Sequence, residues 1–154
     1  MKITKQKTFF AIILLCLFLD QATKYFVDNF LSIGQKITML PSIFSIEKTY
    51  NTGAAFSILQ NNTVLLIFIA IITLSIISFI VITNNKKLKY IETTALGFIA
   101  GGATGNLIDR IIFNHVIDFI QTDFVRFPIF NFADIFINIG AIILLYRIIV
   151  PYND

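Results

Sequence analysis

Four long apolar segments alternate with polar stretches along the chain, at roughly residues 8–28, 63–83, 92–112 and 132–150. A helix of about 20 mostly apolar residues is long enough to cross the hydrocarbon core of a bilayer. The second segment is the clearest, because no charged residue occurs from Val64 to Ile82. We therefore predict an all-α membrane protein with four transmembrane helices that form a single domain over residues 1–154.

The first apolar segment has a second interpretation. Lysines followed by the apolar run Phe9–Leu19 are typical of a secretory signal peptide, which would be removed from the mature protein. No cleavage site of small residues follows this run, and the polar sequence Asp20-Gln21-Ala22-Thr23-Lys24 comes next instead. We therefore expect an uncleaved helix with a polar last part.

The stretch between the first two apolar segments, residues 29–62, is long for a connection. Phe44, Ile46 and Tyr50 occupy even positions among polar neighbours, which is the two-residue period of a strand with one covered face. Asn51-Thr52-Gly53 then indicates a turn. An edge strand here would offer free backbone groups to an extended peptide, although an ordered surface loop fits the pattern equally well.

The charges predict an orientation, since cytoplasmic loops are rich in Lys and Arg. Basic residues cluster before the first segment, between the second and third, and at the end of the fourth: Lys2, Lys5, Lys7, Lys86, Lys87, Lys89 and Arg147. Four spans place all of these on the cytoplasmic side, with both termini. Loops 29–62 and 113–131 are then outside, and four aspartates lie near the outer surface: Asp20, Asp109, Asp118 and Asp134.

Composition agrees with a membrane protein and narrows the chemistry. The chain is 56% hydrophobic and 14% charged, and its net charge of +3 is too small to indicate a nucleic-acid partner. One cysteine, Cys16, excludes an internal disulfide, and we expect it to be packed in the interior. One histidine, His115, excludes a multi-histidine metal site, and we expect it in a surface loop. We expect no metal and no cofactor.

Two aspartates stand in unusually apolar surroundings. Asp118 lies within the run Val116–Ile120, where no capping pattern explains it. A carboxylate near hydrocarbon is costly and is by default a functional hypothesis. Asp134 has a structural alternative, because Asn131 three residues earlier would complete a capping box at a helix start.

Further polar and small residues follow helical spacing. Asp20 and Lys24 are four apart, as in a local ion pair, and could brace an active site. Asn106 and Arg110 share a helix face, whereas the adjacent Asp109 and Arg110 point to different partners. A stripe of small residues predicts close packing with a neighbouring helix: Gly97, Gly101 and Gly105.

Paired carboxylates are the chemistry that this inventory leaves. Two aspartates close enough to share a proton repel each other when both are ionised, so that one is ionised while the other keeps its proton. The ionised group can take a proton from an attacking water molecule, and the other can donate one to the substrate.

Five sequence blocks together resemble the lipoprotein signal peptidase (signal peptidase II) family, a family of bacterial membrane aspartyl proteases. They occur in the family's order and spread over nearly the whole chain: Asp20-Gln21-Ala22-Thr23-Lys24, Asn51-Thr52-Gly53-Ala54-Ala55-Phe56, Gly101-Gly102-Ala103-Thr104-Gly105-Asn106-Leu107-Ile108-Asp109-Arg110, Val116-Ile117-Asp118-Phe119 and Phe130-Asn131-Phe132-Ala133-Asp134.

This resemblance implies a multi-pass protein of the bacterial cytoplasmic (inner) membrane with a small extracytoplasmic β-rich cradle. It implies cleavage of prolipoproteins before their diacylglyceryl-modified cysteine, with globomycin-type cyclic peptides as inhibitors and membrane lipid around the site. It assigns the catalytic pair to Asp118 and Asp134. It also implies that seven residues line or brace the site: Asp20, Lys24, Asn51, Asn106, Asp109, Arg110 and Asn131.

Two other classes of function were compatible with a small membrane protein. A proton-coupled transporter would use buried carboxylates, but it usually places them near the midplane and has inverted repeats, and no repeat occurs here. A membrane scaffold would use the glycine stripe, but it would leave Asp118 without a role.

Overall fold

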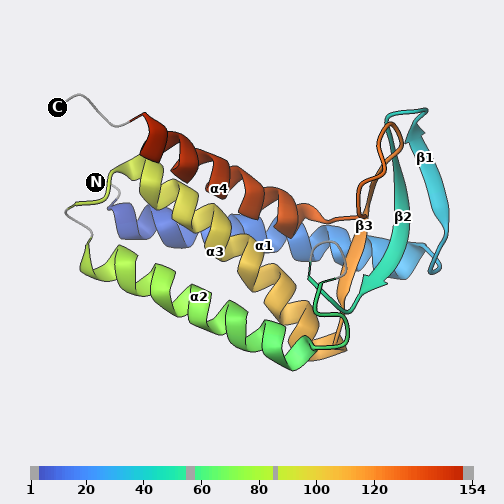
Figure 1. Cartoon of the computed structure of the whole chain (residues 1–154), viewed down its shortest axis with the longest axis horizontal. Helices are drawn as coiled ribbons and strands as arrows, with labels where there is room; N and C mark the ends of the chain where they lie inside the picture. The colour runs from blue at the N-terminus through green and yellow to red at the C-terminus, as the bar shows by residue number, and fades with distance from the viewer. Residues whose placement is uncertain (1–3, 55–57, 85–86, 151–154) are drawn as a thin grey trace.

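The computed structural model describes residues 4–54, 58–84 and 87–150. Within these residues a bundle of helices carries a small antiparallel sheet at one end (Figure 1). The elements in chain order are α1 Lys5–Phe30, β1 Lys36–Leu40, β2 Phe44–Asn51, α2 Thr63–Thr83, α3 Tyr90–Phe113, β3 Val116–Thr122 and α4 Phe132–Ile149. Some residues used in the predictions lie outside the described part of the chain: Lys2, Ala55, Phe56 and Lys86.

Each of the four predicted apolar segments coincides with one helix, with ends that differ by no more than about three residues. Local capping explains two of these ends. The side chain of Thr4 accepts a hydrogen bond from the backbone N–H of Lys7 and begins α1. Asn114 adopts a left-handed conformation (φ 60°) and ends α3.

Among the described residues, three helices are long and apolar enough to cross a membrane by length and composition: α1, α2 and α4. The four predicted helices are present, but four transmembrane helices are not confirmed, because α3 is not such a candidate although it has 24 residues. The reason is its composition, since glycine, threonine and charged residues replace aliphatic ones along much of α3. These residues are tolerated because α3 packs against α1, α2 and α4 and is the helix with the most buried positions.

The glycine stripe of α3 allows this close packing. A Cβ at Gly101 would lie 2.7 Å from the Cβ of Cys16 on α1, and one at Gly97 would lie 3.1 Å from the Cβ of Ile12. Gly102 faces the opposite neighbour, where a Cβ would collide with the backbone of Ala133 on α4. The predicted small-residue packing face is thus confirmed, and it serves helices on two sides of α3.

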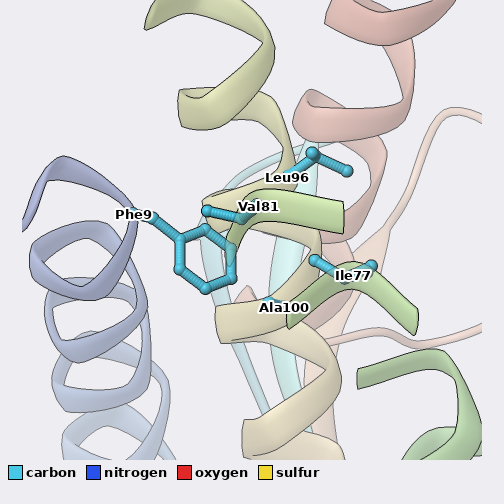
Figure 2. Packing of buried hydrophobic residues seen from close by; sticks show 5 residues of the cluster. All are labelled: Phe9, Ile77, Val81, Leu96 and Ala100. Atoms are coloured by element: carbon cyan, nitrogen blue, oxygen red, sulfur yellow. The ribbon is translucent and has the colours of Figure 1, made fainter. Parts of the chain in front are cut away.

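One apolar core lies toward the end of the bundle remote from the sheet. Figure 2 shows its buried members, which come from α1, α2 and α3: Phe9, Ile77, Val81, Leu96 and Ala100. At the same end lie the start of α1, the α2–α3 connection and the end of α4 (Figure 1). The basic residues that these segments carry are therefore gathered at the end opposite the sheet: Lys5, Lys7, Lys87, Lys89 and Arg147.

The sheet has the strand order β1-β2-β3 and is antiparallel throughout. The strand expected at residues 44–50 is confirmed as β2, although its buried positions are Ser45 and Lys48 and not the apolar residues of the alternation. Asn51–Gly53 is a turn in which the Asn51 side chain accepts from the Gly53 N–H (2.9 Å). The sequence of β3 has no alternation of apolar and polar residues that would predict a strand, because Val116–Phe119 is buried on both faces of the sheet. A β-rich unit beside the helices was expected only from the family resemblance.

Lys48 of β2 joins the sheet to the end of α1. Its ammonium group donates to the backbone carbonyls of Asp28 (2.8 Å) and Leu31 (3.1 Å), which the last turn of α1 leaves without helical partners. It also pairs with the Asp28 carboxylate at 2.8 Å. Below this contact Val27 packs against Ile117 and Phe119 of β3, so the sheet has a firm position over the bundle.

Candidate active site

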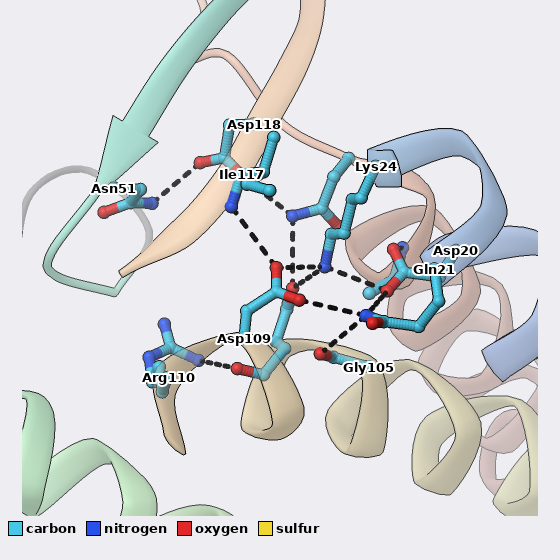
Figure 3. Close-up of polar contacts among 12 residues, drawn as sticks. Asp20, Gln21, Lys24, Asn51, Gly105, Asp109, Arg110, Ile117 and Asp118 are labelled. Atoms are coloured by element: carbon cyan, nitrogen blue, oxygen red, sulfur yellow. Dashed lines mark hydrogen bonds and ion pairs between the residues drawn. The ribbon is translucent and has the colours of Figure 1, made fainter. Parts of the chain in front are cut away.

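The polar residues singled out in the sequence meet where the sheet joins the helix ends. They come from five elements that are distant in sequence, and Figure 3 shows how the side chains from α1, α3, β2 and β3 point toward one another. All nine belong to one continuous hydrogen-bonded network: Asp20, Lys24, Asn51, Asn106, Asp109, Arg110, Asp118, Asn131 and Asp134.

Lys24 is the centre of the inner half of this network. Its ammonium nitrogen lies 2.9 Å from carboxylate oxygens of Asp20 and Asp109 and 2.9 Å from the side-chain oxygen of Asn106. The three side chains of this ion pair cluster are at most 2% exposed. An ammonium group has three N–H donors, and here all three have acceptors, which a buried charge requires. The predicted Asp20–Lys24 ion pair is confirmed, with Asp109 as a second carboxylate.

The same cluster fixes the surrounding backbone. Asp20 accepts from the backbone N–H of Ala133 on α4 (3.0 Å), and Asp109 accepts from that of Ile117 on β3 (3.3 Å). Gln21 also donates to both carboxylates, at 3.2 Å and 2.9 Å. Gln21 was not among the predicted site residues, although its place in the polar block after the first apolar run was the available signal.

Arg110 points away from Asp109, as their adjacent positions on a helix predicted. Its guanidinium donates to the backbone carbonyl of Gly53 at 2.8 Å and, more weakly, to that of Asn106 at 3.4 Å. The guanidinium therefore ties α3 to the turn that follows β2, and that turn carries Asn51 into the site.

Asp118 stands on β3 and is 2% exposed. Its two carboxylate oxygens each accept one hydrogen bond from an amide, from Asn51 at 2.9 Å and from Asn131 at 2.6 Å. Burial, and after it the negative charge of Asp134, raise the pKa of Asp118 to about 7, against the lowering effect of the two amides and of Lys24. A carboxyl group that titrates near neutrality can act as an acid at physiological pH.

Asp134 lies in the first turn of α4 and has two tasks. The capping box is confirmed, since Asn131 accepts from the Asp134 N–H (3.1 Å) and one Asp134 oxygen accepts from the Asn131 N–H (3.2 Å). The other oxygen accepts from the side chain of Asn106 at 2.9 Å. The capping interpretation is therefore right, and it does not compete with a place in the site.

Both aspartates line the same cavity of about 720 Å³. Asn51, Asn106 and Arg110 share its wall, and the loop Phe127–Phe130 and the exposed face of α4 complete it. The cavity thus places two carboxyl groups, the amides of Asn51 and Asn106, the guanidinium group of Arg110 and an apolar wall around one space. Such a mixture suits a substrate that is mainly apolar and is fixed by a few polar contacts.

Cys16 and His115 lie outside this chemistry. Cys16 is buried beside Gly101, as expected of a packed thiol. His115 follows α3, and its ring lies against that of Tyr50 with centroids 3.9 Å apart. In the described part of the chain no three His, Cys, Asp or Glu side chains come together as a metal site would require.

Comparisons with known proteins agree on one family. A family model described as "Signal peptidase (SPase) II" matches residues 12–150. A lipoprotein signal peptidase of Microcystis aeruginosa is 39% identical over 92% of this chain and 91% of its own length, and one of Enterococcus faecalis is 37% identical over 92% and 88%. A bacterial membrane enzyme solved at 2.3 Å superposes with a TM-score of 0.86 and 32% identity, covering 92% of this chain and 87% of that one.

Proposed function

Because this chain belongs to the signal peptidase II family of aspartic peptidases, we propose that it cuts prolipoproteins immediately before their diacylglyceryl-modified cysteine, with Asp118 and Asp134 as the catalytic pair. Cleavage of lipoprotein signal peptides is the activity of the family. Membership of this family argues against the transporter and scaffold interpretations. The observation that carries the catalytic assignment is that both aspartates line one cavity while Asn131 bonds to both.

The two carboxyl groups have different surroundings, which suggests different tasks. Asp118 is almost fully buried, with a pKa of about 7, and is the group that holds the proton. Asp134 is only half-buried and is the carboxylate that takes a proton from water. The water oxygen bonds to the scissile carbonyl carbon, Asp118 gives its proton toward the developing oxyanion or leaving nitrogen, and the C–N bond breaks to leave an acid and an amine.

The remaining site residues position this pair. Asn51 and Asn131 hold Asp118, and Asn106 holds Asp134. The cluster of Asp20, Lys24 and Asp109 orients Asn106 through the Lys24 ammonium group. Arg110 is on the cavity wall, where its guanidinium can bind a carbonyl of the substrate. The mechanism uses no metal and no cofactor.

We place the site near the extracytoplasmic face of the bacterial inner membrane. The basic residues at the opposite end of the bundle support this, because positive charges favour the cytoplasmic side. In this arrangement α3 is the fourth transmembrane helix, the whole chain is one peptidase domain, and both termini are cytoplasmic. The cavity is then open to a substrate that is anchored in the surrounding lipid, and globomycin-type cyclic peptides should occupy the same space.

Purified protein in lipid vesicles tests the proposal. It is incubated with a diacylglyceryl-modified precursor, with the unmodified precursor, and with each in the presence of a chelator. We expect a new N-terminal lipid-modified cysteine only from the modified precursor, at a rate that the chelator does not change. Equal cleavage of the unmodified precursor would overturn the substrate assignment, and loss of cleavage with chelator would overturn the metal-free mechanism.

A further inference from the structure

The cavity extends beyond the two aspartates along α4. Asp134, Ile135, Asn138, Ile139 and Ile142 all line it, and their spacing of three and four residues places them on one helix face. The distance from Asp134 to Ile142 is eight residues, or about 12 Å of helix. The cavity wall therefore continues from the site into the part of α4 that is apolar enough to span a membrane.

Asn138 is the exception on this wall, because its neighbours there below Asp134 are isoleucines: Ile135, Ile137, Ile139 and Ile142. Its side chain is exposed, and within the described residues it takes part in no hydrogen bond. An asparagine can satisfy its amide on its own helix, as Asn29 does by donating to the carbonyl of Tyr25 at 2.8 Å. Asn138 instead presents a free donor and a free acceptor to the cavity, in surroundings where polar groups need partners.

A peptide substrate has the matching need. For its scissile bond to reach the aspartates, the segment beside that bond must leave the helical conformation, and its backbone groups then lose their helical partners in apolar surroundings. Asn138 lies four residues below Asp134, about 6 Å along the helix axis. An extended peptide advances about 3.3 Å per residue, so Asn138 is level with the second residue or so on the signal-peptide side of the cut.

We propose that the side-chain amide of Asn138 hydrogen-bonds to the substrate backbone about two residues before the scissile bond and so holds the unwound end of the signal peptide against α4. This inference rests on the proposed peptidase function and names a positioning residue for it. An amide is suited to the task because it can donate to a peptide carbonyl and accept from a peptide N–H at once.

The test combines enzyme variants with synthetic lipopeptides in which one backbone N–H is replaced by an ester oxygen. With the all-amide lipopeptide, Asn138→Leu should lower kcat/KM about tenfold, the usual scale for one hydrogen bond, and Asn138→Ser, which keeps a donor and an acceptor, should lose less. An ester at the second or third residue before the cut should slow the unaltered enzyme and should not slow Asn138→Leu any further. An ester after the cut should affect both proteins alike.

An unchanged kcat/KM in Asn138→Leu would overturn the inference, as would independent, multiplicative losses from the variant and the upstream ester. A loss in Asn138→Leu that no backbone ester reproduces would assign the amide to the lipid ester groups, which also contradicts a backbone contact. Failure of the unaltered protein to cleave the all-amide lipopeptide would instead overturn the proposed function itself, so the two failures are distinguishable.

Discussion

Two pairs of carboxylates lie side by side in this molecule, and their hydrogen-bond and ion-pair partners differ. Asp20 and Asp109 share the ammonium group of Lys24. They also accept hydrogen bonds from the side-chain amide of Gln21 and from the backbone N–H groups of Ala133 and Ile117. Among the described residues, the groups that donate to Asp118 and Asp134 are all neutral amides. One cluster contains a cation at contact distance, whereas the other does not.

The different partners agree with different roles: the cluster around Lys24 supports the fold, and Asp118 and Asp134 are the pair that we propose to react. A carboxylate in contact with a buried ammonium group is held in place, because moving either partner would leave a buried charge without its counter-ion. A carboxylate that is desolvated and faces another negative charge is driven toward its protonated form. The raised pKa of Asp118 is the result of the second situation. The fold thus places the buried ammonium group of Lys24 in the cluster that holds the helices and the strand together, and not in contact with the pair that we propose to be catalytic.

The largest expected effect is on catalysis. Replacing Asp118 by Asn keeps the size of the side chain but removes the proton that we propose the pair exchanges, so the cleavage rate of the folded protein should fall by about 10²–10⁴-fold. Asp134→Asn should lose activity to a similar extent. Asp123→Asn serves as the control, because Asp123 directly follows β3 and pairs with Lys36 outside the cavity. Normal lipopeptide cleavage by Asp118→Asn in a folded state would remove the distinction between the clusters.

The second effect is on stability. Lys24→Met should leave Asp20 and Asp109 buried without their cation, at a cost of about 3–5 kcal/mol in the free energy of unfolding. Thermal unfolding in a fixed detergent measures this loss. Lys36→Met is the matched control, because Lys36 pairs with Asp123 on the surface and its removal should change the unfolding temperature little. A Lys24 variant as stable as the control would show that the inner cluster is not a brace.

The smallest effect is a displacement in pH. Since the pKa of Asp118 is raised to about 7, kcat/KM should fall as the pH rises past that value and Asp118 loses its proton. Asn51 donates to the ionised form of Asp118, so Asn51→Ala should raise this pKa and move the alkaline limb of the profile to higher pH. A limb that stays in place, or moves to lower pH, would contradict the assignment of the proton to Asp118.

The same raised pKa predicts the direction of a stability change. Between about pH 4 and pH 7 the unfolded chain has already ionised this carboxyl group while the folded protein still holds the proton. Asp118 therefore makes the folded state progressively less stable as the pH rises through this window. Asp118→Asn should flatten that part of the dependence of melting temperature on pH.

The helices were predictable from the sequence, and the reasons are local. An uninterrupted apolar run such as Val64–Ile82 has few alternatives to a helix, and its ends follow from the polar residues that flank it. The strand Val116–Thr122 was not predictable in this way, because both of its faces are covered and the alternation disappears. The limited hydropathy of α3 has a similar cause, since its surroundings are protein on several sides.

The sequence indicated which residues belong to the site, but not which hydrogen bonds they form with one another. Asp118 was conspicuous by its apolar neighbours, whereas the assignment of Asp134 needed the family resemblance, because a helix cap explained it equally well. No local pattern indicates that Asn106 accepts from both Lys24 and Asn131 while donating to Asp134. These bonds join residues up to 82 positions apart, and the packing of α1, α3 and α4 brings them together.

The position of the capping box at the start of α4 has a consequence for the order in which the protein folds. Asn131 and Asp134 stand at the start of α4, and Asp118 stands on β3, which precedes α4 in the chain. A chain in which α4 has not yet packed against the other helices contains both aspartates but does not hold them in one site. The proposed catalytic pair therefore forms only when α4 has docked.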